Sequence, residues 1–313
     1  MSDLLASIVG AGSAPGQGAD FVALPSLARR LGVEFDDTTP PRHIALAGAG
    51  GLKLHALDWG GEGPPALFLH GGRLTAQTWD YVCLGLRGTV RAVALDLRGH
   101  GDSDRAADYA FESHVADVGA ALDDLGWSEA HLVGMSYGGL IATHFAAGSP
   151  HRVASLVTVD VGPGVLFEGT ARMRSFFARI DPGEGPEAVI ESAMQTSPLR
   201  DRERIAYRMA AMMRRRDDGA WAWAFDERRA VDYPAVLAKA EEMAAAAERL
   251  SSPCLVVRGA RSPVFPEEAA ARFAGAFRDG AWAVVPDAGH NVQEDNPAGL
   301  LAALARFWST RRG

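Results

Sequence analysis

A serine lies between glycines at the end of an apolar run, in the segment Gly134-Met135-Ser136-Tyr137-Gly138. This is a G-x-S-x-G pattern: the run before it, AHLVGM, predicts a strand, and the small-residue stretch after it predicts a helix. A sharp strand-to-helix turn lifts the serine side chain out of the sheet, and the glycines let neighbouring backbone approach closely. A serine hydroxyl becomes a good nucleophile when a base takes its proton. The pattern therefore predicts an activated serine and requires a histidine nearby.

Of the nine histidines, His290 is best placed to be that base. It lies in PDAGHNVQEDNP, directly after the last predicted strand, where a loop delivers an imidazole to the strand ends. The serine also precedes the histidine in the chain, which is one known order for this chemistry. His100, in DLRGHGDSD, is interpreted as part of a structural turn, and three further residues as structural or surface groups: His131, His144 and His151.

An imidazole in this role needs a carboxylate that fixes its tautomer and stabilises the imidazolium formed in the reaction. Asp160 is the strongest candidate, because it ends the strand-like run VASLVTVD and so lies at the same rim of the sheet as the serine. A carboxylate that ends an apolar strand is costly to bury without a partner. Its alternative role is a cap or turn before the GPG segment. Asp287, Glu267 and Glu268 are weaker candidates, since the first shapes its own loop and the other two suit a helix N-terminus.

Alternating strand-like and helix-like segments position these side chains. Continuous apolar strands that alternate with helices indicate an α/β fold with a mostly parallel central sheet, covered on both faces. Chemistry is then expected at the carboxyl ends of the strands. About eight strands are predicted, at 42–48, 52–59, 65–70, 90–96, 130–135, 153–160, 253–259 and 281–287, and flanking helices at 75–87, 111–125, 137–149, 266–278 and 297–309.

Two parts of the chain break this alternation. Residues 161–250 show helical periodicity, no convincing strand, and many Met, Trp and Phe side chains, so they are predicted to form a helical cap inserted after the sixth strand. Residues 1–41 form an extension rich in Gly, Ala and Pro, with one helix-like part, ALPSLARRLGV. The stretch GAGSAPGQG lacks the G-x-G-x-x-G spacing and a preceding strand, so no dinucleotide is expected there. The core domain is accordingly assigned to 42–160 and 251–313.

Composition restricts the class of partner. The 313 residues carry 31 basic and 39 acidic side chains, a formal charge of −8, which offers no field that gathers nucleic acid or anionic lipid. The start of the chain lacks the basic region of a signal peptide, and no apolar stretch suits a membrane span. The two cysteines, Cys83 and Cys254, do not indicate a disulfide framework. We expect a cytoplasmic protein with a small-molecule substrate and no metal or cofactor, and homo-oligomerisation is left open.

Four segments of the sequence resemble the α/β-hydrolase superfamily: LFLHGG at 67–72, ALDLRGHGDSD at 94–104, GMSYGG at 134–139 and PDAGHNVQEDNP at 286–297. The resemblance covers 42–309 and implies the α/β-hydrolase fold. By this resemblance Ser136 is the nucleophile and His290 the base, and the backbone N–H groups of Gly72 and Tyr137 form an oxyanion hole.

The third member of the family's catalytic triad departs from its usual place. Relatives carry an aspartate in a G-x-x-D turn after the strand that corresponds to PCLVVRG, whereas this turn reads Gly259-Ala260-Arg261-Ser262. Ser262 holds no charge, so the acid must come from elsewhere in the chain. Some branches of the superfamily, including certain haloalkane dehalogenases, look similar in carrying their acid at the end of the strand that Asp160 ends.

By the same resemblance, the dehalogenases and epoxide hydrolases of this superfamily carry an aspartate at the position of Ser136. A serine at this turn therefore favours transfer of an acyl group to water. The sequence predicts a cofactor-independent serine hydrolase that cleaves a carboxylic ester or lactone of a small, largely apolar substrate. Arg73, Trp221, Trp223 and Phe225 are predicted to contact that substrate. The alternatives are hydrolysis of a carbon–carbon bond beside a ketone, and a catalytically weak ligand-binding module, which Ser262 at the acid position would suit.

Overall fold

An eight-stranded sheet forms the centre of the molecule. The computed structural model describes residues 21–166, 168–228 and 232–310, so the glycine-rich stretch within 1–20 lies outside the described residues. The strand order is β1-β2-β4-β3-β5-β6-β9-β10. The strands are β1 (Arg42–Ala47), β2 (Lys53–Gly60), β3 (Pro65–Leu69), β4 (Arg91–Leu95), β5 (Ala130–Met135), β6 (Val153–Val159), β9 (Cys254–Gly259) and β10 (Gly280–Val285).

Strand β2 is antiparallel to both of its neighbours, and every pair from β4 to β10 is parallel. Alternate residues of the central strands are buried on opposite faces: in β3, Leu67 and Leu69 belong to one apolar cluster, and Ala66 and Phe68 belong to the other. Burial on both faces explains why these strands read as continuous apolar runs. The predicted mostly parallel sheet of eight strands is confirmed.

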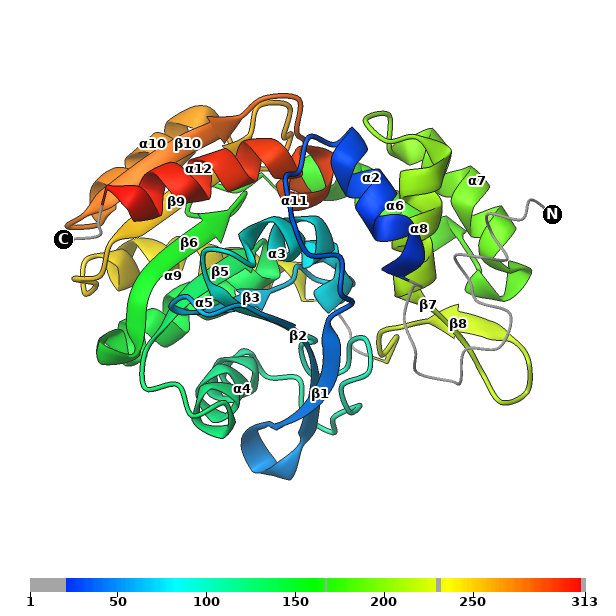
Figure 1. Cartoon of the computed structure of the whole chain (residues 1–313), viewed down its shortest axis with the longest axis horizontal. Coiled ribbons are helices and arrows are strands. Elements are labelled where there is room, and N and C mark those ends of the chain that lie inside the picture. The colour runs from blue at the N-terminus through cyan, green and yellow to red at the C-terminus, as the bar shows by residue number, and fades with distance from the viewer. Residues whose placement is uncertain (1–20, 167, 229–231, 311–313) are drawn as a thin grey trace.

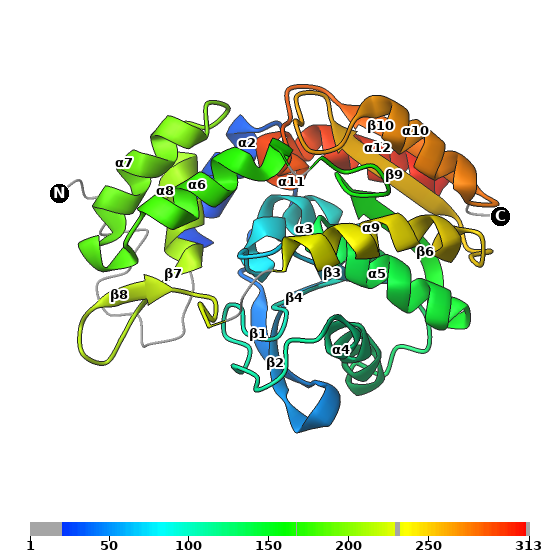
Figure 2. The same ribbon diagram turned by 180° about the vertical axis from the view of Figure 1, so that it is seen from behind.

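Helices cover both faces of the sheet (Figure 1, Figure 2). Residues of α2, α3 and α12 join the apolar cluster on one face, and residues of α4, α5, α9 and α10 join the cluster on the other. A short helix, α11, follows β10. The helices are α2 (Leu24–Arg30), α3 (Asp80–Leu86), α4 (Phe111–Asp124), α5 (Tyr137–Gly148), α9 (Tyr233–Ala247), α10 (Glu267–Ala276), α11 (Val292–Asp295) and α12 (Pro297–Ser309).

Between β6 and α9 the chain forms a group of elements at one end of the sheet (Figure 1, Figure 2). They are α6 (Ala171–Arg179), α7 (Pro186–Thr196), α8 (Arg202–Met212) and a hairpin of β7 (Met213–Arg215) and β8 (Trp221–Trp223). We call this group, from α6 to β8, the cap. The hairpin is an addition to the helices expected for 161–250. Helix α9, also within that range, packs instead against α5, and its Ala240 and Met243 join the apolar cluster of the sheet.

Helix α2 connects the N-terminal part of the described chain to both the sheet and the cap. Leu24 and Leu27 are buried in the apolar cluster that contains α3 and α12. The guanidinium of Arg30 pairs with the carboxylate of Glu203 on α8. This part of the 1–41 extension is therefore a packed structural element, at the place where the sequence predicts a helix.

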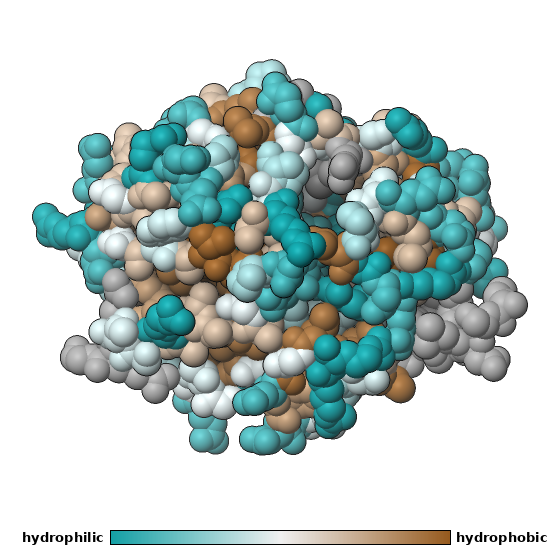
Figure 3. Space-filling view, turned by 90° about the horizontal axis from the view of Figure 1, so that it is seen from above, coloured by the Kyte–Doolittle hydropathy of each residue, from teal (hydrophilic) through white to brown (hydrophobic). Residues whose placement is uncertain are grey.

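The surface shows scattered apolar residues. On the face seen in Figure 3, hydrophobic residues form separate patches among hydrophilic ones. Among the described residues, the exposed large apolar side chains are Val22, Leu166, Trp282 and Val284, and scattered exposures of this kind are common on folded proteins. Within the described ranges, none of the helices has both the length and the apolar character that crossing a membrane requires.

Candidate active site

Ser136 lies at a sharp turn between β5 and α5. Its backbone has φ 49° and ψ −118°, a conformation that non-glycine residues rarely adopt and that surrounding structure must hold in place. A Cβ on Gly134 would lie 2.4 Å from the carbonyl oxygen of Gly138, and a Cβ on Gly138 would lie 2.3 Å from that of Leu69. Both glycines are thus required by close backbone contacts around the serine.

Ser136, Asp160 and His290 meet at the carboxyl ends of three parallel strands, β5, β6 and β10. Nε2 of His290 lies 3.2 Å from Oγ of Ser136, and Nδ1 of His290 donates a 2.7 Å hydrogen bond to Oδ2 of Asp160. Asp160 directly follows β6 and is fully buried, and His290 stands in the loop between β10 and α11. At these distances an imidazole can take the serine proton while the carboxylate holds its tautomer.

The carboxylate of Asp160 has three hydrogen-bond donors. The backbone N–H of Gly259 donates to Oδ1 over 3.0 Å, and the hydroxyl of Ser262 and the imidazole of His290 donate to Oδ2. The oxygen of Ser262 in turn accepts from the backbone N–H of Val264, over 3.2 Å. These donors replace the water that a buried charge loses. Ser262, at the family's usual acid position, therefore supports the carboxylate of Asp160.

The loop after β3 lies against the serine. A Cβ on Gly71 would lie 2.6 Å from Sδ of Met135 and 3.4 Å from Cβ of Ser136. Gly72 and Tyr137, the two residues predicted to supply oxyanion donors, both line the cavity at Ser136. Tyr137 is also the first residue of α5, and backbone N–H groups point out of the N-terminus of a helix. Both positions therefore suit donors to an oxyanion.

Two side chains of the DLRGHGDSD segment brace this loop. The backbone N–H of Arg73 donates to Nε2 of His100 over 3.3 Å, and that of Ala76 donates to Oδ1 of Asp96 over 2.6 Å. Burial alone would raise the pKa of Asp96, but the hydrogen bond from His55 and its charge lower that pKa to about 2. The segment that the sequence assigns to a structural turn thus anchors the loop that carries Gly72.

A cavity of about 110 Å³ lies at Ser136, and it is mostly apolar. Two cationic residues, Arg73 and Arg208, also line it. A larger, open cavity of about 810 Å³ adjoins it, and the two share Phe177, Arg208 and His290. The apolar side chains that line the smaller cavity are Leu74, Met135, Leu140, Val161, Val165, Leu166, Phe177, Val236, Leu237, Ala240 and Val264.

Only one of the four residues predicted to contact substrate, Arg73, lines the cavity at Ser136. Trp223 and Phe225 line a separate cavity of about 100 Å³ that also includes Arg73. Their rings stack with centroids 5.7 Å apart, and Trp221 lines neither cavity. These three aromatic residues therefore lie outside the lining of the cavity at Ser136, and their contact with the substrate stays a prediction. Phe177, on α6 of the cap, does line that cavity.

Sequence reasoning missed Arg208, although it lies one helical turn after Arg204 on α8. Its Nη1 lies 3.3 Å from Oε2 of Glu294, and the side-chain oxygen of Asn291 accepts from both of its terminal nitrogens at 3.1 Å. Burial lowers the pKa of Arg208. Burial would raise the pKa of Glu294, but Arg208 and Arg200 hold it below its ordinary value. The signal in the sequence was the four-residue spacing of Arg204 and Arg208, which places both on the same face of a helix.

Comparison with known proteins identifies the family of this chain. The sequence profile of the alpha/beta hydrolase fold family matches residues 64–297. This chain belongs to the α/β-hydrolase family. The esterase Rv0045c of Mycobacterium tuberculosis is 33% identical over 304 residues, which is 93% of this chain and 96% of the esterase. The family predicted from the four motifs is confirmed.

Two solved structures of α/β-hydrolase relatives extend the comparison. The crystal structure of the esterase Rv0045c has a TM-score of 0.74 and 29% identity to this chain, and covers 94% of this chain and 99% of that chain. The crystal structure of E-2-(acetamidomethylene)succinate hydrolase has a TM-score of 0.71 at 25% identity, over 86% of this chain and 100% of that chain. Both relatives are named as hydrolases, one of them as an esterase.

Proposed function

We propose that this protein is a serine esterase in which Ser136 is the nucleophile, His290 the general base and Asp160 the acid that orients it. The observation that carries the proposal is the hydrogen-bonded series from Ser136 through His290 to Asp160 beside a mostly apolar cavity. Similarity to the esterase Rv0045c along nearly the whole chain supports the type of reaction.

In the acylation step, His290 takes the proton of Ser136 as Oγ attacks the ester carbonyl carbon. The backbone N–H groups of Gly72 and Tyr137 stabilise the oxyanion of the tetrahedral intermediate. His290 then gives its proton to the alcohol oxygen, which leaves, and the acyl group remains on Ser136. A water molecule repeats the sequence as nucleophile, with His290 again as base, and the carboxylic acid and free Ser136 are released.

The cavity favours a small ester or lactone with a largely apolar portion. A mostly apolar wall with a few polar groups is typical of a site that orients such a substrate. Arg73 and Arg208 are the cationic groups on that wall, and a guanidinium pairs well with a carboxylate. The related hydrolase named above acts on a substituted succinate. A carboxylate on the substrate would therefore suit this site.

A catalytically weak binding module is disfavoured by the contacts of Asp160. That alternative rests on the serine at position 262, which holds no charge. Since the carboxylate of Asp160 hydrogen-bonds both to His290 and to Ser262, an acid is available where the mechanism needs one.

The test is covalent labelling by a fluorophosphonate, with the labelled residue located by mass spectrometry, alongside hydrolysis of p-nitrophenyl butyrate. We expect the label on Ser136, and we expect Ser136→Ala to lose the label and about 10⁶-fold in kcat, a loss typical of a serine nucleophile. The matched control is Ser309→Ala, at an exposed position at the end of α12, which should leave both unchanged. Labelling at another residue, or turnover retained by Ser136→Ala, would overturn the proposal.

A further inference from the structure

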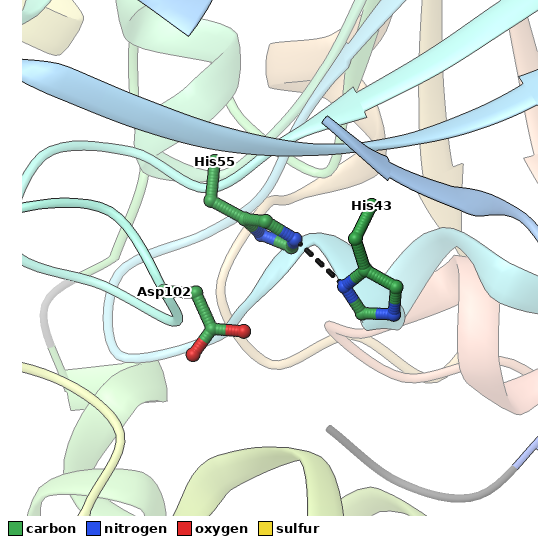
Figure 4. Close-up of side chains that lie close together, drawn as sticks. All are labelled: His43, His55 and Asp102. Carbon is green, nitrogen blue, oxygen red and sulfur yellow. Dashed lines mark hydrogen bonds between the residues drawn. The ribbon is translucent and has the colours of Figure 1, made fainter. Parts of the chain in front are cut away.

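Two histidines 12 residues apart in the sequence meet across β1 and β2. In this antiparallel pair His43 lies opposite Leu57 and His55 lies opposite Ala45, so the histidines are diagonal neighbours on one face. Nδ1 of His43 and Nε2 of His55 are 2.9 Å apart. Figure 4 shows the two imidazoles joined by this contact, with Asp102 beside them on a neighbouring loop. One potential ligand atom from each of the three residues lies within 4.8 Å of the other two.

Asp96, which follows β4, holds two of these three residues in place. Its Oδ2 accepts from Nδ1 of His55 at 2.7 Å and from the backbone N–H of Asp102 at 3.0 Å. Asp96 itself is buried, with 2% of its surface exposed. Because Asp96 accepts from Nδ1 of His55, Nε2 of His55 is the ring nitrogen that faces the site. Proteins usually orient a metal-binding histidine by such a carboxylate on its other ring nitrogen.

We propose that His43, His55 and Asp102 bind a divalent transition-metal ion of the Zn²⁺ class, with water as the fourth ligand. Two imidazole nitrogens and a carboxylate oxygen form a donor set that Zn²⁺ accepts in tetrahedral sites. The ion takes the place of the proton between the two imidazole nitrogens. His43 then carries its proton on Nε2, so two neutral imidazoles bind the ion without a net release of protons. The site is distinct from the Ser136 cavity, since none of its three residues lines that cavity.

Binding requires only small movements. On a tetrahedral ion with Zn–N bonds of about 2.0 Å, the two nitrogens lie about 3.3 Å apart, whereas they are 2.9 Å apart here. His43 is exposed on the edge strand β1, so its side chain can absorb the difference. Asp102, on a surface loop, closes the remaining distance by rotation of its side chain.

The charges around the site suit a divalent cation. The carboxylate of Asp102 lies at the site and that of Asp96 lies behind His55. Arg214, on β7 of the cap, donates to Oδ1 of Asp102 over 3.1 Å. Two carboxylates against one guanidinium leave a negative excess before the ion enters. Since Arg214 occupies Oδ1, we assign the other oxygen of Asp102 to the ion.

The test is a titration of the metal-free, full-length protein with Co²⁺ and Zn²⁺. Co²⁺ absorption in the visible reports a four-coordinate site, and competition with a chromogenic chelator gives the Zn²⁺ dissociation constant. We expect about one ion per chain, bound at least as tightly as micromolar, and a loss of about 10-fold or more in affinity in His43→Ala and in Asp102→Asn. His151→Ala, which removes an exposed histidine elsewhere, should leave the affinity unchanged.

Two further measurements distinguish binding at His43, His55 and Asp102 from binding at the Ser136 cavity and from a loss of folding. His290→Gln removes the imidazole at the Ser136 cavity, and this variant should still bind the ion. Loss of metal binding in His290→Gln would overturn the proposal. Circular dichroism and thermal melting of His43→Ala must match the wild type, because His43 is an exposed side chain. Wild-type protein that binds no ion at about 100 μM, or His43→Ala that binds as tightly as wild type, refutes the site.

Discussion

Replacing Asp160 by asparagine should remove most activity through the tautomer of His290. The new amide must keep its oxygen on the backbone N–H of Gly259, where Oδ1 lies 3.0 Å away, because an NH₂ group there would face another donor. The NH₂ group then faces Nδ1 of His290 and the hydroxyl of Ser262. Nδ1 must accept, so the imidazole proton moves to Nε2, beside Oγ of Ser136. In this tautomer His290 cannot take the serine proton.

The expected loss in kcat is about 10⁴-fold, as for a triad locked in the wrong tautomer, which corresponds to about 5.5 kcal/mol in transition-state stabilisation. The assays are steady-state hydrolysis of p-nitrophenyl butyrate and the rate of fluorophosphonate labelling. Asp287→Asn is the matched control, because its carboxylate is exposed and pairs with Arg261 at the surface; its rate should stay within about threefold of wild type.

A second substitution tests the same reasoning in the opposite direction. Ser262→Asp, added to Asp160→Asn, restores a carboxylate at the family's usual position and should recover part of the lost activity. A folded Asp160→Asn protein that loses less than about tenfold in kcat would refute the assignment, because a correct tautomer would then persist without the acid.

Three more predictions address the surroundings of the site. Ser262→Ala removes one donor from Asp160 and should lower kcat about tenfold with little change in KM, since a hydrogen bond to a charged group contributes about 1.5 kcal/mol or more; unchanged steady-state kinetics would contradict it. Arg208→Gln should lower kcat/KM for the anionic ester mono-p-nitrophenyl succinate by about tenfold more than kcat/KM for the neutral butyrate ester. An equal loss for both esters would show that Arg208 is only structural. Burial raises the pKa of Asp80 well above its ordinary value, so above about pH 4 the unfolded chain releases a proton that the folded protein keeps. The unfolding free energy of the wild type should therefore fall with rising pH, relative to that of Asp80→Asn, by up to about 1.4 kcal/mol per pH unit. Urea denaturation at pH 5, 6 and 7 measures both free energies, and the same pH dependence in the two proteins would contradict the prediction.

Much of the site could be predicted because its residues follow strands whose pattern is dictated by burial on both faces. The predicted strand 130–135 matches β5, so Ser136 lies at the strand end, and the predicted strand before Asp160 ends within one residue of β6. His290 follows the last strand, as expected. The hydrogen bond between Ser262 and Asp160 could not be predicted, because it depends on the path of the turn after β9.

Other features depend on packing that the sequence pattern leaves open. The alternation in WAWAF marks residues with a shared face, but it does not say what covers that face, and Trp223 and Phe225 turn out to stack on each other. The apolar side of α9 contacts α5, although its position in the chain suggested the cap. His43 and His55 are 12 residues apart, and only the register of β1 on β2 brings them together.

The position of the proposed acid, Asp160 at the end of β6, separates the catalytic charge from the turn after β9. The backbone N–H of Ser136 donates to the carbonyl of Val159 over 3.0 Å, so the spacing between nucleophile and acid is set by two adjoining strands. The turn after β9 keeps only a supporting role, yet Arg261 and Pro263 in that turn border the larger cavity. Substitutions of Arg261 or Pro263 can reshape access to the larger cavity while the proposed catalytic carboxylate stays in place. A relative whose acid lies in that turn lacks this freedom.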